Sequence, residues 1–327
     1  MIAEDIWYRG HPLGYPLRPL SWLFEGLVRV RQRLHRGRRD PRRRLPALVI
    51  VVGNLTVGGT GKTPLVIWLA DWLLRGGYRP GILTRGYRGQ ARRWPQWVTP
   101  DSDPDLVGDE AVVLARRTGV NVVAGPDRRA AGAWLIARGG CDIILSDDGL
   151  QHYRLPRDLE ILVIDGQRGL GNGLCLPAGP LREPAARVDT VDMVVGHGAD
   201  WPGGYRMDLI GDRVVNLRDP ERIADLAAWR GRAVTAVAGI GNPLRFFEGL
   251  RAAGLIVREW RYPDHHRYGS DDVRRWPSGP VIMTEKDAVK CARMAAVDHW
   301  YLPVAARLDA SFAAAFSQRL EDLLRNG

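Results

Sequence analysis

The sequence predicts an α/β fold of two units, the first of which is a parallel sheet covered by helices on both faces. Three observations support this prediction. The chain of 327 residues is long enough for about two domains with separate cores. From residue 45 to residue 198, β-branched apolar runs alternate with helix-like patterns, as parallel sheets require. A second series of strand-like runs begins at residue 232.

The N-terminal segment, residues 1–44, combines an amphipathic helix with a basic run. Its apolar stripe at helical spacing consists of Leu20, Leu23, Phe24, Leu27 and Leu34, widened by Trp22, Val28 and Val30. Residues 29–44 hold nine arginines against one aspartate, in a chain whose formal charge is +10. Residues 19–44 therefore suit an anionic membrane surface, and they fit equally a helix docked on its own protein beside a solvated basic tail. An arm for nucleic acid is a weaker third alternative.

The first unit is assigned to residues 45–204. Strands are predicted in residues 45–54, 120–126, 141–149, 159–166 and 190–198, and residues 80–89 as a strand followed by a loop. Helices are predicted in residues 62–77, 107–118 and 127–139. Residues 167–187 are rich in glycine and proline and have no period, which is typical of a functional loop. No signal peptide is recognisable, and no apolar run reaches about 18 residues, so no simple spanning helix is predicted.

The remaining chain is divided into a linker and a second domain. Residues 205–217 are predicted to form a hairpin linker, and residues 218–327 a smaller α/β domain. Strands are predicted there in residues 232–243, 255–266 and 279–287, with a terminal helix from about residue 310.

A glycine-rich segment, "TVGGTGKT", lies between the strand of residues 45–54 and the helix that follows it. This is the context of a phosphate-binding P-loop, whose backbone N–H groups and helix N-terminus surround phosphate. Lys62 would reach the β- and γ-phosphates of ATP, and the Thr63 hydroxyl would ligate Mg²⁺. The usual first glycine is replaced by Thr56, which removes no ligand. The predicted cofactor-binding residues are Thr56, Gly58, Gly59, Thr60, Gly61, Lys62 and Thr63.

Two acidic residues lie at the end of the strand predicted in residues 141–149. These residues, Asp147 and Asp148, stand where a P-loop protein needs a second metal-binding carboxylate. One is expected to hold Mg²⁺ directly or through water and the other to orient water or substrate, and the sequence does not divide these roles. A strand-ending aspartate that caps a turn is the simpler alternative.

Candidates for accepting the proton of an attacked hydroxyl are less distinctive. Asp109 and Glu110 precede a helix, where capping alone explains them. His265 and His266 follow a strand, and adjacent strand residues point to opposite sides, so at most one readily faces a given cleft. Taken alone, both histidines are explained as ordinary surface or core residues.

Basic residues complete the set of candidates. Arg85 and Arg182 could bind phosphate, since a guanidinium matches phosphate oxygens, although each alone fits a surface arginine. The chain contains only three lysines, Lys62, Lys286 and Lys290, which suggests that lysine is kept for its chemistry, although Lys290 also fits as incidental. The three cysteines are far apart and form no Cys-x-x-Cys pair, which argues against zinc and a disulfide framework.

Together these motifs resemble the tetraacyldisaccharide 4′-kinase (lipid A 4′-kinase) family. The matching strings run in order along almost the whole chain: "VGNLTVGGTGKTP", "TRGYRG", "GDEA", "SDDGLQH", "LPAGPLREP", "GIGNPLRFF", "PDHHRY" and "TEKDAVK". Most are not general to P-loop proteins, and the family also accepts a non-glycine residue at Thr56.

The resemblance implies transfer of the ATP γ-phosphate to the 4′-hydroxyl of tetraacyldisaccharide 1-phosphate, giving lipid IVA. It implies a P-loop NTPase-like domain and a smaller α/β/α domain joined by a two-stranded linker, with the site between them. It favours the membrane for residues 19–34, on the cytoplasmic face of the bacterial inner membrane. Neither nucleic acid nor an obligate protein partner is expected.

By motif position, the resemblance assigns the catalytic aspartate to Asp109 and its histidine partner to His265, which reverses the simpler explanations above. The probable metal, phosphate or substrate contacts are Glu110, Asp147, Asp148, Arg182 and Glu183. Two rival functions stay open: another P-loop ATP-dependent enzyme, such as a dethiobiotin synthetase-like ligase, and a nucleotide-switched protein that binds nucleic acid.

Overall fold

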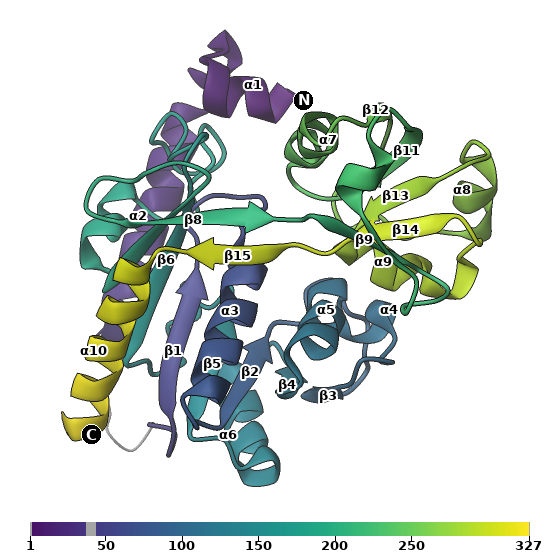
Figure 1. The fold of residues 1–327 in the computed structure, drawn as a ribbon. Helices are drawn as coiled ribbons and strands as arrows, with labels where there is room; N and C mark the ends of the chain where they lie inside the picture. The colour runs from purple at the N-terminus through teal and green to yellow at the C-terminus, as the bar shows by residue number, and fades with distance from the viewer. Residues whose placement is uncertain (1, 37–43, 327) are drawn as a thin grey trace.

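The computed structural model describes residues 2–36 and 44–326, and its strands form two sheets (Figure 1). The first sheet has the order β15-β8-β7-β6-β1-β5-β2-β4-β3. These strands are β1 (Leu48–Gly53), β2 (Pro80–Thr84), β3 (Gln96–Val98), β4 (Asn121–Ala124), β5 (Ile143–Asp147), β6 (Leu159–Asp165), β7 (Met193–His197), β8 (Tyr205–Ile210) and β15 (Ala305–Leu308). From β8 to β4 the neighbours are parallel, and both edge strands are antiparallel, so the predicted parallel sheet is confirmed.

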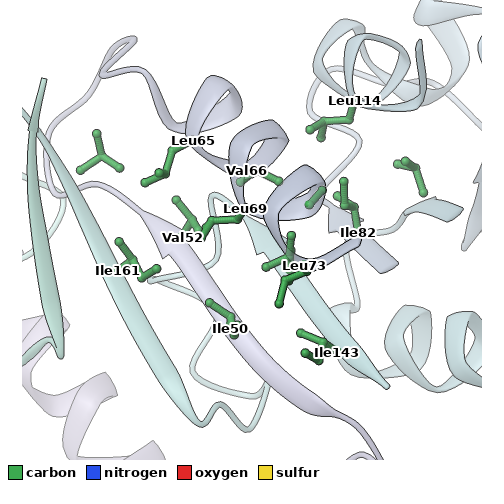
Figure 2. Close-up of a cluster of buried hydrophobic side chains, with 14 of the residues drawn as sticks. Ile50, Val52, Leu65, Val66, Leu69, Leu73, Ile82, Leu114, Ile143 and Ile161 are labelled. Carbon is green, nitrogen blue, oxygen red and sulfur yellow. The ribbon is translucent and has the colours of Figure 1, made fainter. Parts of the chain in front are cut away.

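Helices cover both faces of this sheet. The helices that pack on it are α2 (Arg18–Arg36), α3 (Lys62–Arg75), α5 (Asp109–Thr118), α6 (Arg128–Gly139) and α10 (Ala310–Asn326); α4 (Pro104–Val107) precedes α5. Successive residues of β1 serve opposite faces: Ile50 and Val52 pack toward α3, whereas Val49 and Val51 pack with the α6 side. Figure 2 shows Ile50 and Val52 beneath the helix. This two-sided burial explains the continuous apolar run of the strand.

The second sheet has the order β10-β9-β14-β13-β11-β12. Its strands are β9 (Arg213–Asn216), β10 (Ile223–Asp225), β11 (Ala233–Ala238), β12 (Ile256–Arg261), β13 (Val281–Thr284) and β14 (His299–Leu302). Its helices are α7 (Pro243–Ala252), α8 (Ser270–Arg275) and α9 (Glu285–Cys291). Short 3-10 helices lie at Pro12–Gly14, Ala185–Thr190, Leu226–Trp229 and Ala292–Met294. The four strands from β14 to β12 are parallel, which gives the second unit its own α/β core.

The connection between the two units is two-stranded, as the resemblance implies, but it is not the hairpin predicted in residues 205–217. Residues 205–217 do not form a hairpin, because β8 pairs with β7 and β15 while β9 pairs with β10 and β14. Two chain crossings, β8 to β9 and β14 to β15, join the sheets (Figure 1). The C-terminal part also returns to the first unit, since Phe312 and Phe316 of α10 pack against Trp68 and Trp72 of α3. The second unit therefore ends before β15, not at residue 327.

The N-terminal segment forms α1 (Ile2–Arg9) and α2, and it lies against the first unit. The α2 helix docks through a mixed face: Ser21 donates to the carbonyl of Cys175 at 2.7 Å, and Gln32 donates to Glu183 at 2.7 Å. Its other face is apolar and more than half exposed, at Leu20, Trp22, Leu23, Leu27, Val30 and Leu34. No helix within the described ranges is long and apolar enough to span a membrane. Residues 37–43 of the predicted basic run lie outside the described residues.

Candidate active site

The P-loop runs from β1 to the first residue of α3. Gly58 and Gly61 have φ angles of 112° and 92°, a backbone conformation that favours glycine. A Cβ atom added at Gly61 would lie 3.0 Å from Nδ1 of His197, at the end of β7, so space also requires glycine here. Thr56 is buried and pairs with Leu181 in an isolated β-bridge, which anchors the start of the loop to the 180–182 segment.

Lys62 brings the start of α3 to the end of β5. Its Nζ lies 3.4 Å from Asp148 Oδ1 and 3.1 Å from Asn54 Oδ1. Arg182 donates to both oxygens of Asp148, at 3.0 and 2.9 Å. Burial would raise the pKa of Asp148, but the charges of Lys62 and Arg182 hold this pKa well below its usual range. Asp148 is therefore ionised, and its charge is already balanced by two cations.

Asp147 is in the opposite situation. Burial, together with the charges of Glu110 and Asp148, raises its pKa to about 7, although the charge of Lys62 opposes this. Its Oδ2 accepts from the Thr63 hydroxyl at 3.4 Å, while its buried Oδ1 has no hydrogen-bond partner among residues 2–36 and 44–326. A hard cation with oxygen ligands fits this arrangement, because it would bind the unpaired oxygen and remove the cost of ionising Asp147.

The residues that fit Mg²⁺ are thus Thr63 and Asp147. In the part of the chain that the structure describes, no three His, Cys, Asp or Glu side chains gather as a metal cluster. A P-loop magnesium ion needs few protein ligands, since phosphates and water complete its shell. Glu110, a third predicted ligand, forms an ion pair with Lys286 at 2.5 Å, so a protein cation already holds its carboxylate.

Asp109 and His265 meet across the two units. Asp109 is the first residue of α5, and His265 lies beyond β12, 156 residues later. Nδ1 of His265 lies 3.1 and 3.0 Å from the two carboxylate oxygens of Asp109. Burial would raise the pKa of Asp109, but the hydrogen bond with His265 and the charges of His265, Lys286 and Lys290 bring it to about 2. The structure therefore brings together the two residues that the resemblance paired.

The neighbouring histidine turns away from this pair. His266 Nε2 lies 3.0 Å from Asp272 Oδ2, and the His266 ring stacks on Tyr262 with centroids 4.4 Å apart. His265, in contrast, has φ 57°, and its ring contacts Tyr87 of the first unit at a centroid distance of 4.9 Å. Burial would lower the pKa of His265, but the hydrogen bond and charge of Asp109 raise it. This geometry favours His265 as the imidazole that faces the cleft.

A charged seam between α5 and α9 continues from this pair. Its three ion pairs join Asp109 to Lys290 at 3.6 Å, Glu110 to Lys286 at 2.5 Å, and Arg117 to Glu285 at 2.8 Å. Each pair links one unit to the other, and the first two involve predicted site residues. The part of the candidate site around Asp109 is thus built on an interface of opposite charges.

The second unit also contacts the P-loop and the ends of β6 and β7. Gly241 of the second unit lies close to the P-loop, since a Cβ atom added there would be 2.9 Å from the backbone nitrogen of Gly59. The same atom would be 3.4 Å from Oδ2 of Asp264, the residue before His265, so the P-loop and the His265 segment are close to each other. Arg245 of α7 donates to Asp165 Oδ1 at 2.8 Å, and its guanidinium lies 2.8 Å from His197 Nδ1.

Other predicted residues occupy different positions. Glu183 is completely buried and accepts from Gln32 and Gln151, both at 2.7 Å, so it anchors α2 rather than lining an open surface. Arg85 is exposed just beyond β2. Burial of His152, together with the charges of Arg128 and Arg85, lowers the pKa of His152 to about 4.

Sequence reasoning left the role of Lys290 open and assigned none to Arg245. The rarity of lysine was the signal for Lys290, and the only signal for Arg245 was its place in the string "GIGNPLRFF".

A P-loop, a magnesium-suitable aspartate and a hydrogen-bonded Asp–His pair at one domain interface define a P-loop phosphotransferase. Comparison with known proteins identifies which one: residues 13–321 match the model of the tetraacyldisaccharide-1-P 4′-kinase family (LpxK), and the chain belongs to this family.

Relatives and a solved structure agree with this assignment. The chain is 51% identical over 313 residues to a tetraacyldisaccharide 4′-kinase of Nitrosococcus oceani, covering 94% of this chain and 91% of the relative. It is 52% identical over 313 residues to that of Alkalilimnicola ehrlichii, covering 92% and 91%. LpxK from Aquifex aeolicus, solved in complex with ATP, superposes with a TM-score of 0.75 at 28% identity and covers 96% of this chain and 99% of that one. The predicted family and fold are confirmed.

Proposed function

We propose that this protein transfers the γ-phosphate of ATP to the 4′-hydroxyl of tetraacyldisaccharide 1-phosphate, the reaction named by its family. The observation that carries the proposal is the Asp109–His265 pair, which lies at the same domain interface as the P-loop. A P-loop alone defines only the phosphate donor, whereas a paired acid beside it supplies a base for a hydroxyl acceptor.

In this proposal Asp109 accepts the hydroxyl proton and His265 orients it. The hydrogen bond from His265 and the nearby lysines keep Asp109 ionised at neutral pH, as a base must be. Because His265 belongs to the second unit, the base is complete only when the two units are docked. Docking would also exclude water and limit futile ATP hydrolysis.

The donor side is proposed to lie wholly on the first unit. The backbone of residues 58–61 would surround the phosphates, and Lys62 would move from Asp148 to the β- and γ-phosphates. When bound at Thr63 and Asp147, Mg²⁺ would neutralise charge that develops on the phosphate oxygens. Arg182, which holds Asp148, and Arg85 at the end of β2 are retained as proposed phosphate or substrate contacts.

The exposed apolar face of α2 is proposed to bind the membrane that contains the lipid substrate, on the cytoplasmic face of the bacterial inner membrane. Six large apolar side chains stay exposed on it although the opposite face is docked, and arginines flank them. Flotation with anionic lipid vesicles tests this. Leu23→Ser/Leu27→Ser should abolish binding, whereas Ile256→Ser, which changes an equally exposed residue of the second unit, should not.

The activity test is direct. The protein is incubated with γ-labelled ATP, Mg²⁺ and tetraacyldisaccharide 1-phosphate in detergent micelles, and labelled lipid product is expected. No labelled lipid in micelles or vesicles would overturn the proposal. Activity on a soluble acid after deletion of the α2 segment would instead favour a ligase of the dethiobiotin synthetase type, and salt-sensitive RNA or DNA binding without lipid turnover would favour a nucleic-acid protein.

A further inference from the structure

All three lysines of the chain lie at the candidate site. The chain has 47 lysines and arginines, of which only Lys62, Lys286 and Lys290 are lysine. Lys62 contacts Asp148 and Lys286 contacts Glu110. The third, Lys290, approaches Asp109 Oδ2 at 3.6 Å, and its only role described so far is to help keep Asp109 ionised.

Lys290 is held in a fixed position by its own unit. Its side chain is 8% exposed, and its Nζ lies 3.0 Å from Asp287 Oδ1 and 5.1 Å from the centre of the Tyr268 ring. Asp287 is completely buried and accepts hydrogen bonds from the hydroxyls of Thr284 and Tyr268, at 2.6 and 3.0 Å, and from the Gly239 nitrogen at 3.0 Å. Asp287 therefore cannot shift easily, and it fixes Lys290.

The contacts of Asp109 come from both units. Oδ1 accepts from the Glu110 nitrogen of its own helix at 2.8 Å and lies 3.1 Å from His265 Nδ1, whereas Oδ2 lies 3.0 Å from His265 Nδ1 and 3.6 Å from Lys290 Nζ. His265 is within hydrogen-bond distance of both oxygens. Lys290 Nζ has no hydrogen-bond partner within the described residues, so it acts on Oδ2 through its charge. A buried carboxylate without such partners would be costly to keep ionised.

Lysine suits this position better than arginine. The ammonium is a compact charge with rotatable donors, while a guanidinium is a wide planar fork. The space is narrow: the cavity that Lys290 lines together with Asp109 and His265 has a volume of about 20 Å³, room for roughly one water molecule. In a chain that otherwise uses arginine, this restriction explains a buried lysine.

We propose that Lys290 is a positioning residue for the phosphoryl-transfer reaction, which orients Asp109 toward His265 and links this pair to Asp287 in the second unit. The inference rests on the proposed function, because it assigns Lys290 to the base of that reaction. Lys290 does not contact substrate in this role. It acts through Asp109, so its loss should change the rate of chemistry more than the binding of either substrate.

The test compares three variants. Lys290→Met removes the charge and keeps the length of the side chain, Lys290→Arg restores the charge, and Arg293→Met removes an exposed cation just beyond the same helix, which joins Asp103 at 3.4 Å. In Lys290→Met, kcat should fall at least about tenfold, with both KM values within about twofold, since small misplacements of reacting groups cost up to about 10²-fold. Lys290→Arg should recover part of kcat, and Arg293→Met should stay near wild type, because an exposed ion pair contributes little.

A second measurement does not depend on turnover. The imidazole Nδ1–H proton of His265, assigned by its loss in His265→Gln, should be shifted or lost in the NMR spectrum of Lys290→Met and retained in Arg293→Met. An unchanged signal with wild-type kcat in Lys290→Met would overturn the inference. Equal losses of kcat and melting temperature in Lys290→Met and in the control variant would also overturn it. If wild type transfers no phosphate, the proposed function fails, and the NMR signal alone decides whether Lys290 positions the pair.

Discussion

Asp147 and Asp109 are both buried, yet their pKa values move in opposite directions. The pKa of Asp147 is raised to about 7 by burial and by Glu110 and Asp148, and one of its oxygens lacks a partner within the described residues. Burial acts on Asp109 as well, but His265, Lys286 and Lys290 outweigh it and lower its pKa to about 2. One aspartate requires a cation from outside the protein, and the other already has its cations.

The difference follows from which unit supplies the partners. Asp147 is surrounded mainly by first-unit groups: Thr63 and Lys62 of α3, Glu110 of α5 and the adjacent Asp148. The cationic partners of Asp109 all belong to the second unit. In the proposed reaction, the donor half of the site can therefore form in the first unit alone, whereas the acceptor half exists only when the second unit is docked. This asymmetry is what gating by domain closure requires.

The largest effect is expected for Lys62→Ala, which breaks the donor half. Lys62 balances Asp148 in this structure and would contact the β- and γ-phosphates with ATP bound. By analogy with other lost transition-state donors, kcat should fall by about 10³-fold or more. Steady-state kinetics with γ-labelled ATP measures this. A wild-type kcat would refute the P-loop assignment, and a normal melting temperature would confirm that the variant is folded.

Asp109→Asn is expected to break only the acceptor half. The amide cannot take the hydroxyl proton, so kcat should fall by roughly 10²-fold or more, the usual contribution of a general base. ATP affinity, measured by calorimetry, should stay near wild type because the donor half is untouched. Asp105→Asn is the control, since this exposed acid joins Arg267 of the second unit at 3.3 Å without touching the pair. Weakened ATP binding in Asp109→Asn would mean that the two halves are not separable.

The two halves also differ in how far the sequence could predict them. Local patterns predict the positions of Lys62, Thr63 and Asp147. A glycine loop between a strand and a helix, and an acid at the end of a strand, have nearly the same geometry wherever they occur. The Asp109–His265 contact joins residues 156 apart, and only the family resemblance paired them. Apolar periodicity predicted the helix α10 but not which unit it packs against. Phe312 and Phe316 could be buried against either sheet, and the structure places them in the core of the first unit.

A smaller effect is expected where the second unit touches the donor half. Arg245→Met removes the bond to Asp165 and the contact with His197 without altering the P-loop. Because the docked state should be less populated and the base is complete only in that state, kcat should fall by up to about tenfold, the loss of one charged hydrogen bond of roughly 1.5 kcal/mol. The Kd for ATP should stay near wild type, since the donor half forms in the first unit.

The control for this variant is Arg251→Met. Arg251 lies on the same helix but pairs with Glu259 inside the second unit at 2.5 Å, so kcat should not change. A raised Kd for ATP in Arg245→Met would contradict the comparison, because it would show that the donor half depends on docking.

The finest test of the comparison is stability against pH without Mg²⁺ or nucleotide. Asp147 has a raised pKa, so the stability from its protonated form is complete below about pH 4 and is lost as the pH rises through about 7. Asp147→Asn should therefore melt a few degrees above wild type near pH 8, with a smaller difference near pH 5. Asp109 has a lowered pKa and contributes stability at neutral pH, so Asp109→Asn should melt below wild type near pH 8. Calorimetry measures the melting temperature of both variants. Changes of the same sign near pH 8 would contradict the contrast between Asp147, which lacks a cationic partner, and Asp109, which is already paired.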